Sequence, residues 1–385
     1  MSIAPAFFLL FLITVTSFYW FLPPGTGRAR ALLLIGASAV AVFLISPVAL
    51  VVAVAAAVGA SLMSARLAER RSQVAMILAI AAVLGVLVMT RVALPTELTF
   101  LDLTGSAFFC LKAIAIIADA YRFGRQTSLT DSLLLVLFFP TYEAGPIEQP
   151  RTLNQSSCQA TFDFERFIGG FGRIAIGLVK QAYLAPIIVL ELAARISPWE
   201  GDELVAGGQG MLALWMLLKW LQIYIMFSGY SDVAIGAARL MGIQIRENFK
   251  LPFMAENLQD FWKRWHISLI DFMSMYVYQP FVRRTGWRYR GIMVLFLLTG
   301  LWHAFNLQYL LWGALHGCVM ATLARWQRSE TGDRFRAYVA ERRVLELGVG
   351  AASRVGTLFF VAWVSAIGGS ETWEMAVQVL TFGGL

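Results

Sequence analysis

Long apolar runs separated by short polar loops make up most of the chain. A helix needs about 20 residues to cross roughly 30 Å of hydrocarbon. The runs that match or approach this length are residues 1–23, 31–63, 74–92, 103–117, 132–150, 168–192, 204–227, 291–324 and 345–367. This pattern predicts an all-α polytopic membrane protein with about ten transmembrane or re-entrant segments.

Some runs depart from the pattern of one run for one helix. Run 31–63 is too long for a single span, and Pro47 near its middle predicts two helices joined tightly. Run 291–324 has room for two segments. Run 132–150 ends in a stretch with proline and glycine, which we expect to enter the membrane without crossing it. Run 1–23 has no basic leader and no small-residue cleavage site, so we expect a retained helix.

Basic residues gather after the first, third and fifth predicted helices. The arginines at these three places are Arg28 and Arg30, then Arg66, Arg70 and Arg71, then Arg122 and Arg125. Cytoplasmic loops carry an excess of basic residues, so these ends belong in the cytoplasm and the N-terminus outside. Segment 325–343, with six arginines against three acidic residues, is placed in the cytoplasm for the same reason.

Composition supports the membrane interpretation. Hydrophobic residues make up 58% of the 385 positions and charged residues 14%, against about 25% charged in a soluble domain. Soluble enzymes, disordered tails and fibres are therefore excluded. The net charge of +7 comes from short basic loops, so it predicts membrane orientation and lipid contact rather than nucleic-acid binding. Three distant cysteines, Cys110, Cys158 and Cys318, predict neither a disulfide framework nor a metal site.

Residues 228–290 mix charges, aromatic residues and apolar residues without a clear 20-residue span. Such a stretch must be buried in protein, line a wet cavity or lie at the interface. It is either an amphipathic cytoplasmic loop or the functional centre. We expect Asp232 and Glu247 to form structural ion pairs. Lys263 and Arg264 are interface anchors or contacts for the phosphates of an acyl carrier or coenzyme A.

The chain has three histidines, His266, His303 and His316. His303 follows an apolar run, so we expect it to be buried, where neutral imidazole is suited to general-base catalysis. On one continuous helix His316 would point roughly 140° away from His303, and we expect it to be structural. Asn306 lies three residues after His303 and should share its helix face, to orient the ring, bind an oxyanion or bond to a neighbouring helix.

Several short motifs carry a family resemblance. They are FFPTYEAGPI at 138–147, FSGYSD at 227–232, ENF at 247–249, FWKRWHISL at 261–269, GLWH at 300–303 and LWGALHG at 311–317. In this order and spacing they resemble the membrane-bound O-acyltransferase (MBOAT) family. They are similar to its bacterial branch of alginate and cellulose O-acetyltransferases and teichoic acid D-alanyltransferase. The resemblance covers about residues 107–317.

The resemblance implies a multi-helix core with a central tunnel in the bacterial cytoplasmic (inner) membrane. An acyl thioester, acetyl-CoA or an acyl carrier protein, arrives as co-substrate from the cytoplasmic side, with no bound cofactor and no metal. A hydroxyl of a polysaccharide or envelope polymer, or of an acyl-relay protein, accepts the acyl group outside. His303 corresponds to the catalytic histidine and His266 to a second one. Substrate contacts are assigned to Asn306, Trp302, Trp265, Lys263 and Arg264.

The sequence departs from the family pattern in two places. Ala304 stands where relatives commonly have glycine, and Ser274-Met275 stands where they commonly have Arg-Asp. The resemblance assigns that ion pair to acceptor or partner docking, and the second change removes it. We expect one acyltransferase domain over 1–385, with N-terminal helices 1–105, a core 106–324 and a C-terminal part 325–385.

Acetyl transfer is favoured over D-alanyl transfer to teichoic acid. A transporter or flippase is the alternative from another class. Transporters often show repeated halves, whereas the histidine-bearing motifs of this chain occur only in its C-terminal half.

Overall fold

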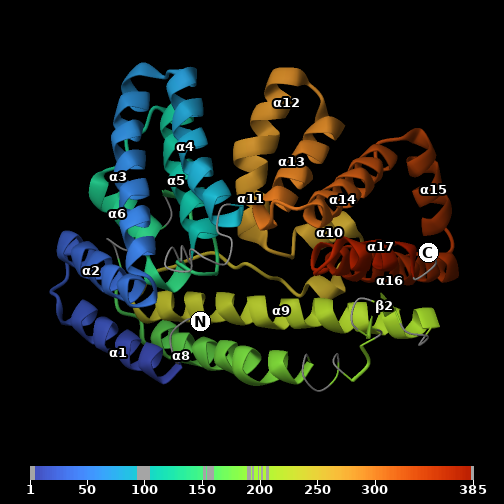
Figure 1. The fold of residues 1–385 in the computed structure, drawn as a ribbon, viewed down its shortest axis with the longest axis horizontal. Helices are drawn as coiled ribbons and strands as arrows, with labels where there is room; N and C mark the ends of the chain where they lie inside the picture. The colour runs from blue at the N-terminus through green and yellow to red at the C-terminus, as the bar shows by residue number, and fades with distance from the viewer. Residues whose placement is uncertain are drawn as a thin grey trace. The chain divides into compact units, whose positions relative to one another are not determined.

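The computed structural model describes residues 5–92, 105–150, 160–188 and 208–382, together with a few positions between 153 and 204. Cys158 lies outside the described residues. Across the described part the chain is helical, apart from turns and one two-residue antiparallel pairing of β1 (Trp199–Glu200) with β2 (Glu203–Leu204). The prediction of an all-α membrane protein is confirmed (Figure 1).

The N-terminal helices follow the apolar runs closely. They are α1 (Pro5–Phe21), α2 (Gly27–Ile45), α3 (Pro47–Arg70), α4 (Gln73–Val92), α5 (Ser106–Phe123), α6 (Leu129–Leu137) and η1 (Phe139–Thr141). The break predicted at Pro47 is confirmed. Ser46 separates α2 from α3, and its hydroxyl accepts a hydrogen bond from the Ala49 N–H at 3.1 Å. Serine at the N-cap with proline at the first helical position is a strong helix start.

The remaining helices differ in length. They are α8 (Phe164–Val179), η2 (Lys180–Leu184), α9 (Gly208–Leu240), η4 (Pro252–Met254), α10 (Leu258–Trp262), α11 (Ile267–Met273), η5 (Ser274–Tyr278), α12 (Gln279–Thr285), α13 (Arg288–His303), α14 (Leu307–Trp326), α15 (Glu330–Ala340), α16 (Arg343–Gly368) and α17 (Trp373–Thr381). Run 291–324 forms two helices, as its length allowed. The mixed polar and apolar stretch expected at residues 228–290 begins after Leu240 in the structure, because α9 continues through Asp232.

Five helices in the described part are long and apolar enough to cross a membrane, namely α2, α3, α9, α14 and α16. Shorter apolar segments, Ala6–Phe21 and Gln73–Met89, lie in α1 and α4. These assignments rest on length and composition. The expected count of about ten segments therefore stays a prediction.

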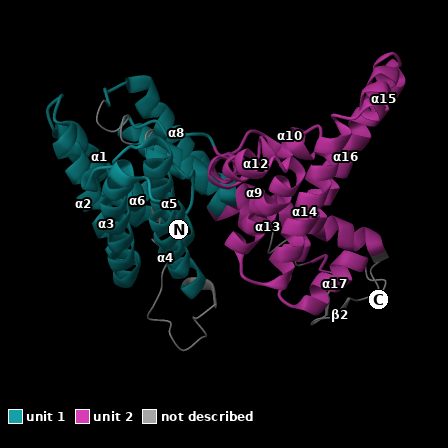
Figure 2. Cartoon of the chain, turned by 90° about the horizontal axis from the view of Figure 1, so that it is seen from above, with its two compact units in different colours: residues 1–181, 227–247 teal, residues 182–226, 248–385 magenta. Residues whose placement is uncertain are grey.

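The chain forms two compact units (Figure 2). Unit 1 comprises residues 1–181 and 227–247, and unit 2 comprises residues 182–226 and 248–385. Helix α9 contributes its first part to unit 2 and its last part to unit 1. The expectation of a single domain over 1–385 stays a prediction.

Helix α5 forms the centre of unit 1. It packs against α3, α4 and α6, and every residue from Ser106 to Ala120 is buried. This includes Lys112, which is fully buried and donates hydrogen bonds from Nζ to the Thr141 carbonyl and hydroxyl, both at 2.9 Å. Lys112 thereby ties the FFPT segment to α5.

Helix α8 and the last part of α9 cross with their backbones in contact. A Cβ on Gly177 would lie 2.7 Å from the Gly229 carbonyl oxygen, and one on Gly236 would lie 2.7 Å from the Gly170 carbonyl oxygen. The two glycine pairs are seven residues apart on each helix, which fixes the register of the antiparallel crossing.

In unit 2, α13 and α14 form a closely packed helical hairpin. A Cβ on Gly313 would lie 2.5 Å from the Phe296 carbonyl oxygen, so the hairpin depends on glycine at this contact. The short segments between Leu251 and Thr285 lie in the same unit, and α10 and η5 pack against the hairpin. This arrangement brings the WHISL and GLWH motifs together.

Candidate active site

His266 lies in a tight turn between α10 and α11. Asn257 caps α10 by accepting the Asp260 N–H at 3.0 Å. His266 then takes a left-handed conformation with φ +43° before Ile267 begins α11. A left-handed backbone is costly for most residues other than glycine and persists where the surroundings hold it.

Asn248 holds this turn. Its Oδ1 accepts hydrogen bonds from the Ser268 N–H at 3.2 Å and the Ser268 hydroxyl at 2.9 Å, and it lies 3.2 Å from His266 Nδ1. Its backbone carbonyl accepts the Ile267 N–H at 3.0 Å. Asn248 and His266 are both buried. Asn248 of the ENF motif therefore holds the turn of the WHISL motif. The two residues that meet, Asn248 and His266, are 18 residues apart in the sequence.

His303 is the last residue of α13 and is half-buried. The prediction that it is buried is wrong, because α13 ends there instead of carrying the ring deeper into a span. Aromatic rings surround it. Its ring centroid lies 4.8 Å from Trp302, 5.3 Å from the stacked ring of Tyr309 and 5.4 Å from Trp312. Partial exposure leaves the imidazole accessible to a substrate.

Trp302 contacts both of the predicted catalytic histidines. Its ring centroid is 6.1 Å from that of His266 and 4.8 Å from that of His303. Burial lowers the pKa of His266 well below its usual value, and the nearby His303 lowers it further. His266 lies outside the candidate spans. Because its pKa is lowered, the imidazole is neutral at physiological pH.

His316 joins the same group of rings from α14. It is buried, its Nδ1 lies 3.1 Å from the Trp312 carbonyl, and its ring lies 4.3 Å from Trp312 and 5.2 Å from Trp262. A continuous helix from His303 to His316 is contradicted, since the chain turns between α13 and α14. We use "histidine cluster" for the three histidines together with four of their aromatic neighbours, which are Trp262, Trp302, Tyr309 and Trp312.

Asn306 does not share a helix with His303, so that prediction is wrong. It is the exposed N-cap of α14, and its Oδ1 accepts the Tyr309 N–H at 2.9 Å. An asparagine directly before an apolar run is an N-cap signal that sequence reasoning missed. In this structure Asn306 supports the helix that carries Tyr309, the residue stacked on His303.

Trp265 belongs to a neighbouring aromatic group rather than to the histidine cluster. Its ring lies 5.2 Å from Phe249, 5.5 Å from Phe261 and 5.8 Å from Trp220. Phe261 in turn contacts Trp262 at 5.4 Å. Trp265 therefore reaches the histidine cluster through other rings.

Lys263 and Arg264 have different surroundings. Lys263 is exposed and lines a cavity of about 360 Å³, together with Gln259, Trp262, Ile267, Ile270, Asp271 and Met320. Arg264 is half-buried and pairs with Asp260 at 2.9 Å. Burial raises the pKa of Asp260, but hydrogen bonds from Arg264 and the Glu256 N–H and the charge of Arg264 lower it overall. Lys263 remains available to an anion at the cavity.

Asp232 and Glu247 form structural ion pairs, as predicted. Arg173 on α8 donates to Asp232 at 2.9 Å and makes a two-pronged contact with Glu247. Lys180 pairs with Asp232 at 2.6 Å, and Arg239 pairs with Glu247 at 3.3 Å. Arg173 and Lys180 were missed from sequence, although cations within the apolar run 168–192 signal buried partners. We call these five residues the charge network of unit 1.

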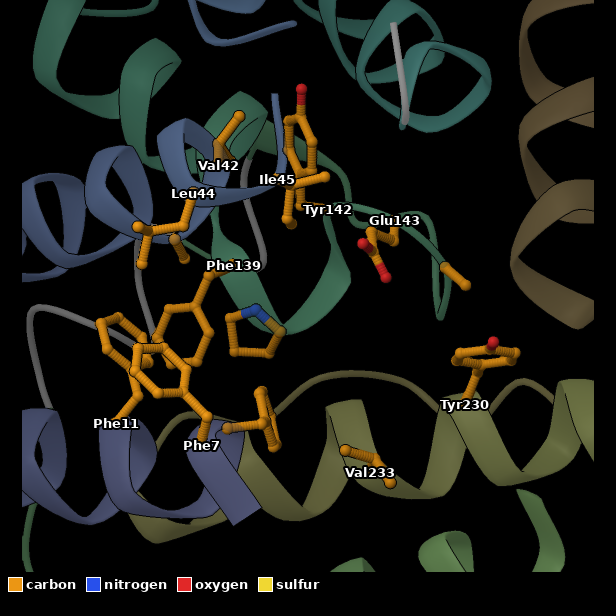
Figure 3. A pocket seen from close by; sticks show the side chains of 14 residues that line it. Phe7, Phe11, Val42, Leu44, Ile45, Phe139, Tyr142, Glu143, Tyr230 and Val233 are labelled. Carbon is orange, nitrogen blue, oxygen red and sulfur yellow. The ribbon is translucent and has the colours of Figure 1, made fainter. Parts of the chain in front are cut away.

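Unit 1 also contains an apolar pocket of about 60 Å³ (Figure 3). Phe7, Phe11 and Phe139 gather at one end, while Glu143 and Tyr230 lie at the other. The rings of Phe11 and Phe139 meet edge to face at 5.4 Å. None of the predicted site residues lines this pocket.

A match to a family model shows which family the chain belongs to. The family model described as MBOAT, membrane-bound O-acyltransferase family, matches residues 32–340, which include the charge network and the histidine cluster. The chain belongs to the MBOAT family. This confirms the resemblance carried by the short motifs.

Three curated relatives illustrate the range of this MBOAT branch. The probable alginate O-acetylase AlgI of Pseudomonas syringae pv. tomato is 32% identical, over 61% of this chain and 43% of the relative. The peptidoglycan O-acetyltransferase of Helicobacter pylori is 28% identical, over 56% of this chain and 46% of the relative. The teichoic acid D-alanyltransferase of Bacillus subtilis is 28% identical, over 56% of this chain and 57% of the relative. The chain spans about half the length of these relatives.

Proposed function

We propose that this MBOAT protein transfers an acyl group from a cytoplasmic thioester to hydroxyls of an extracellular or cell-envelope polymer. The observation that carries the proposal is the histidine cluster, in which the half-buried His303 meets Trp302, Tyr309 and Trp312 within one unit. The names of the relatives, which include a peptidoglycan O-acetyltransferase, support a polymer acceptor.

His303 is assigned the general base. As the acceptor oxygen attacks the thioester carbonyl carbon, its proton passes to the imidazole and a C–O bond forms. The tetrahedral intermediate then collapses with cleavage of the C–S bond, and the imidazolium returns the proton to the departing thiolate. Such assistance contributes about 10² to 10⁴ in rate. The thioester supplies the leaving group, so the reaction needs no serine or cysteine nucleophile.

His266 is assigned the second catalytic position, on the donor side. Because it is neutral, it adds no positive charge that would oppose protonation of His303. Trp302 contacts both rings and is assigned as an apolar wall for the reacting acyl group. Lys263 is assigned to the donor phosphates because it is the exposed cation at the neighbouring cavity.

Acetyl is the favoured acyl group. Relatives named as alginate O-acetylase and peptidoglycan O-acetyltransferase support acetyl transfer. D-alanyl transfer from a carrier-protein thioester is the second candidate, supported by the relative named as teichoic acid D-alanyltransferase. The donor is acetyl-CoA or an acyl carrier protein, and the outer acceptor is a polymer or an acyl-relay protein.

The experiment that tests this function uses the full chain in sealed proteoliposomes. With acetyl-CoA or a carrier thioester outside and a polysaccharide hydroxyl acceptor inside, we expect release of free thiol together with acylation of the acceptor. Supplying only one donor at a time distinguishes acetyl from D-alanyl transfer. Movement of solute or lipid without thioester consumption would contradict the proposal and favour a transporter or flippase.

The proposed orientation places the protein in the bacterial inner membrane with the N-terminus outside. Single cysteines replacing Arg28, Arg70 and Arg125 should resist an impermeant thiol reagent in intact cells and react after permeabilisation. Each single cysteine is introduced into a variant whose three endogenous cysteines are replaced by serine. This variant must first be shown to transfer acyl groups. Labelling of intact cells at any of the three positions would overturn the orientation.

A further inference from the structure

The hydrogen bonds around Asn248 determine which of its side-chain atoms faces His266. Oxygen and nitrogen of an asparagine amide are told apart by their partners. The atom nearest His266 also receives the Ser268 N–H at 3.2 Å and the Ser268 hydroxyl at 2.9 Å. A backbone N–H can only donate, so that atom is the carbonyl oxygen Oδ1.

This orientation determines the protonation of the histidine ring. Oδ1 only accepts hydrogen bonds, and it lies 3.2 Å from His266 Nδ1. Nδ1 must therefore carry the proton. In a neutral imidazole the other nitrogen, Nε2, then holds the lone pair, because the bond made by one ring nitrogen sets the state of the other.

Backbone contacts keep the ring in place. The Asn248 carbonyl accepts the Ile267 N–H at 3.0 Å, and the neighbouring Lys250 N–H donates to the Arg264 carbonyl at 2.9 Å. Bonds on either side of His266 thus stabilise its left-handed backbone. Both Asn248 and His266 are buried, which excludes bulk water from competing for Nδ1.

We propose that Asn248 is a positioning residue that holds His266 as the Nδ1-protonated tautomer, so that Nε2 accepts a hydrogen bond from the hydroxyl or thiol of the reaction. The inference rests on the proposed acyl transfer for its catalytic part. An uncharged acceptor at Nδ1 fixes the tautomer without raising the pKa of His266, whereas a carboxylate there would also stabilise the imidazolium.

A direct test is nitrogen NMR of the full chain labelled with ¹⁵N-histidine in nanodiscs. The chain has three histidines, and His266→Gln assigns the signal of interest. We expect a protonated Nδ1 and an unprotonated Nε2 at neutral pH. The opposite tautomer, or an imidazolium, would overturn the proposal. This readout requires no acyl transfer, so it stands even if the proposed function fails.

Two variants separate positioning from simple structural support. Asn248→Asp keeps an oxygen acceptor but adds charge, so the pKa of His266 should rise by about 1 to 3 units. The protonation step of His266 in the NMR titration and the acid limb of the transfer rate should both move upward by the same amount, with recovery of transfer at higher pH. Ser268→Ala removes one donor to the same oxygen and should leave the tautomer and this titration in place.

Ionisable neighbours enter the interpretation of the titration. Those on the bordering segments are Glu247, Lys250, Glu256, Asp260, Lys263, Arg264, Asp271 and His303, and His303 is the one that lowers the pKa of His266. The Asn248→Asp titration is therefore repeated with His303→Gln. A uniform loss of transfer at every pH in Asn248→Asp would contradict positioning and indicate a structural role. A protonated Nδ1 with an unprotonated Nε2 in a wild type that transfers no acyl group would refute the proposed function while confirming the tautomer.

Discussion

Unit 1 contains a network of paired charges, whereas the centre of unit 2 contains imidazoles among aromatic rings. In the charge network, Arg173 contacts both Asp232 and Glu247. In the histidine cluster, His266 and His316 face uncharged oxygens, the side chain of Asn248 and the Trp312 carbonyl. Both units bury polar side chains, and they satisfy them by different means.

The difference separates structural from chemical uses of a buried polar group. An ion pair fixes the protonation of both partners, and removing one partner leaves a charge without compensation. An imidazole beside a neutral acceptor keeps a defined tautomer and can still take a proton. We therefore expect substitutions in the charge network to lower stability, and substitutions in the histidine cluster to lower the rate of acyl transfer.

The largest effect is expected for His303→Ala. Loss of the general base should reduce acyl transfer by about 10² to 10⁴, or roughly 3 to 5 kcal/mol of barrier, with the thermal unfolding temperature nearly unchanged. Steady-state transfer and unfolding are measured on the same preparation. His303→Gln keeps hydrogen bonding but cannot act as the base. Near-full activity of the glutamine variant would show that His303 only positions a partner.

Arg173→Gln should lower the stability of the protein more than its rate of acyl transfer. It leaves Asp232 and Glu247 without their shared cation, and breaking a buried pair costs about 3 to 5 kcal/mol. Because the arginine side chain is 23% exposed, we expect about 2 to 4 kcal/mol of lost stability after allowing for solvent screening. Arg166→Gln on the same helix is the control, since its pair with Asp163 is exposed. Equal destabilisation by both variants would refute the distinction.

His266→Ala should lower acyl transfer by about 10², the lower end of acid–base contributions, while the protein still inserts and accumulates. The matched control is His316→Gln, because His316 is equally buried but bonds to the backbone of its own helix. We expect a smaller loss of rate in that variant. Transfer rates are compared at matched membrane abundance, and unaltered transfer by His266→Ala would make His266 structural.

The smallest effect is expected at the crossing of α8 and α9. Gly177→Ala places a methyl group against the Gly229 carbonyl, and such overpacking costs about 1 to 3 kcal/mol. Gly172→Ala faces open space on the same helix and should be neutral or stabilising by up to about 1 kcal/mol. Unfolding in detergent compares the two variants. A stabilised Gly177→Ala would disprove the close crossing.

Sequence predicted the local features of the fold better than the distant ones. Apolar run length located the helices, and Pro47 located the break between α2 and α3, because both signals act within one segment. The turn after His303 contains neither glycine nor proline, so the α13–α14 hairpin was left open and Asn306 was placed on the wrong element. The pairing of Arg173 with Asp232, 59 residues away, depends on tertiary packing that one sequence does not encode locally.

The sequence also predicted part of the candidate active site. The motifs identified His266 and His303 as a pair, and the structure places Trp302 against both rings. The position of His316 within the histidine cluster was missed, because it depends on α14 returning antiparallel to α13. The support of His266 by Asn248 was also missed, since it joins two motifs across an irregular segment whose path no periodicity predicts.

Lys112 has a consequence for how the protein is made. A lysine at the centre of a helix opposes entry into the bilayer by about 2.5 to 3.5 kcal/mol on insertion scales, and its Nζ partner, Thr141, is synthesised 29 residues later. While α5 leaves the ribosome, its ammonium group has no such acceptor. The buried surroundings of Lys112 are therefore complete only after the FFPT segment has been synthesised, so we expect residues 106–141 to complete their packing as one biosynthetic unit.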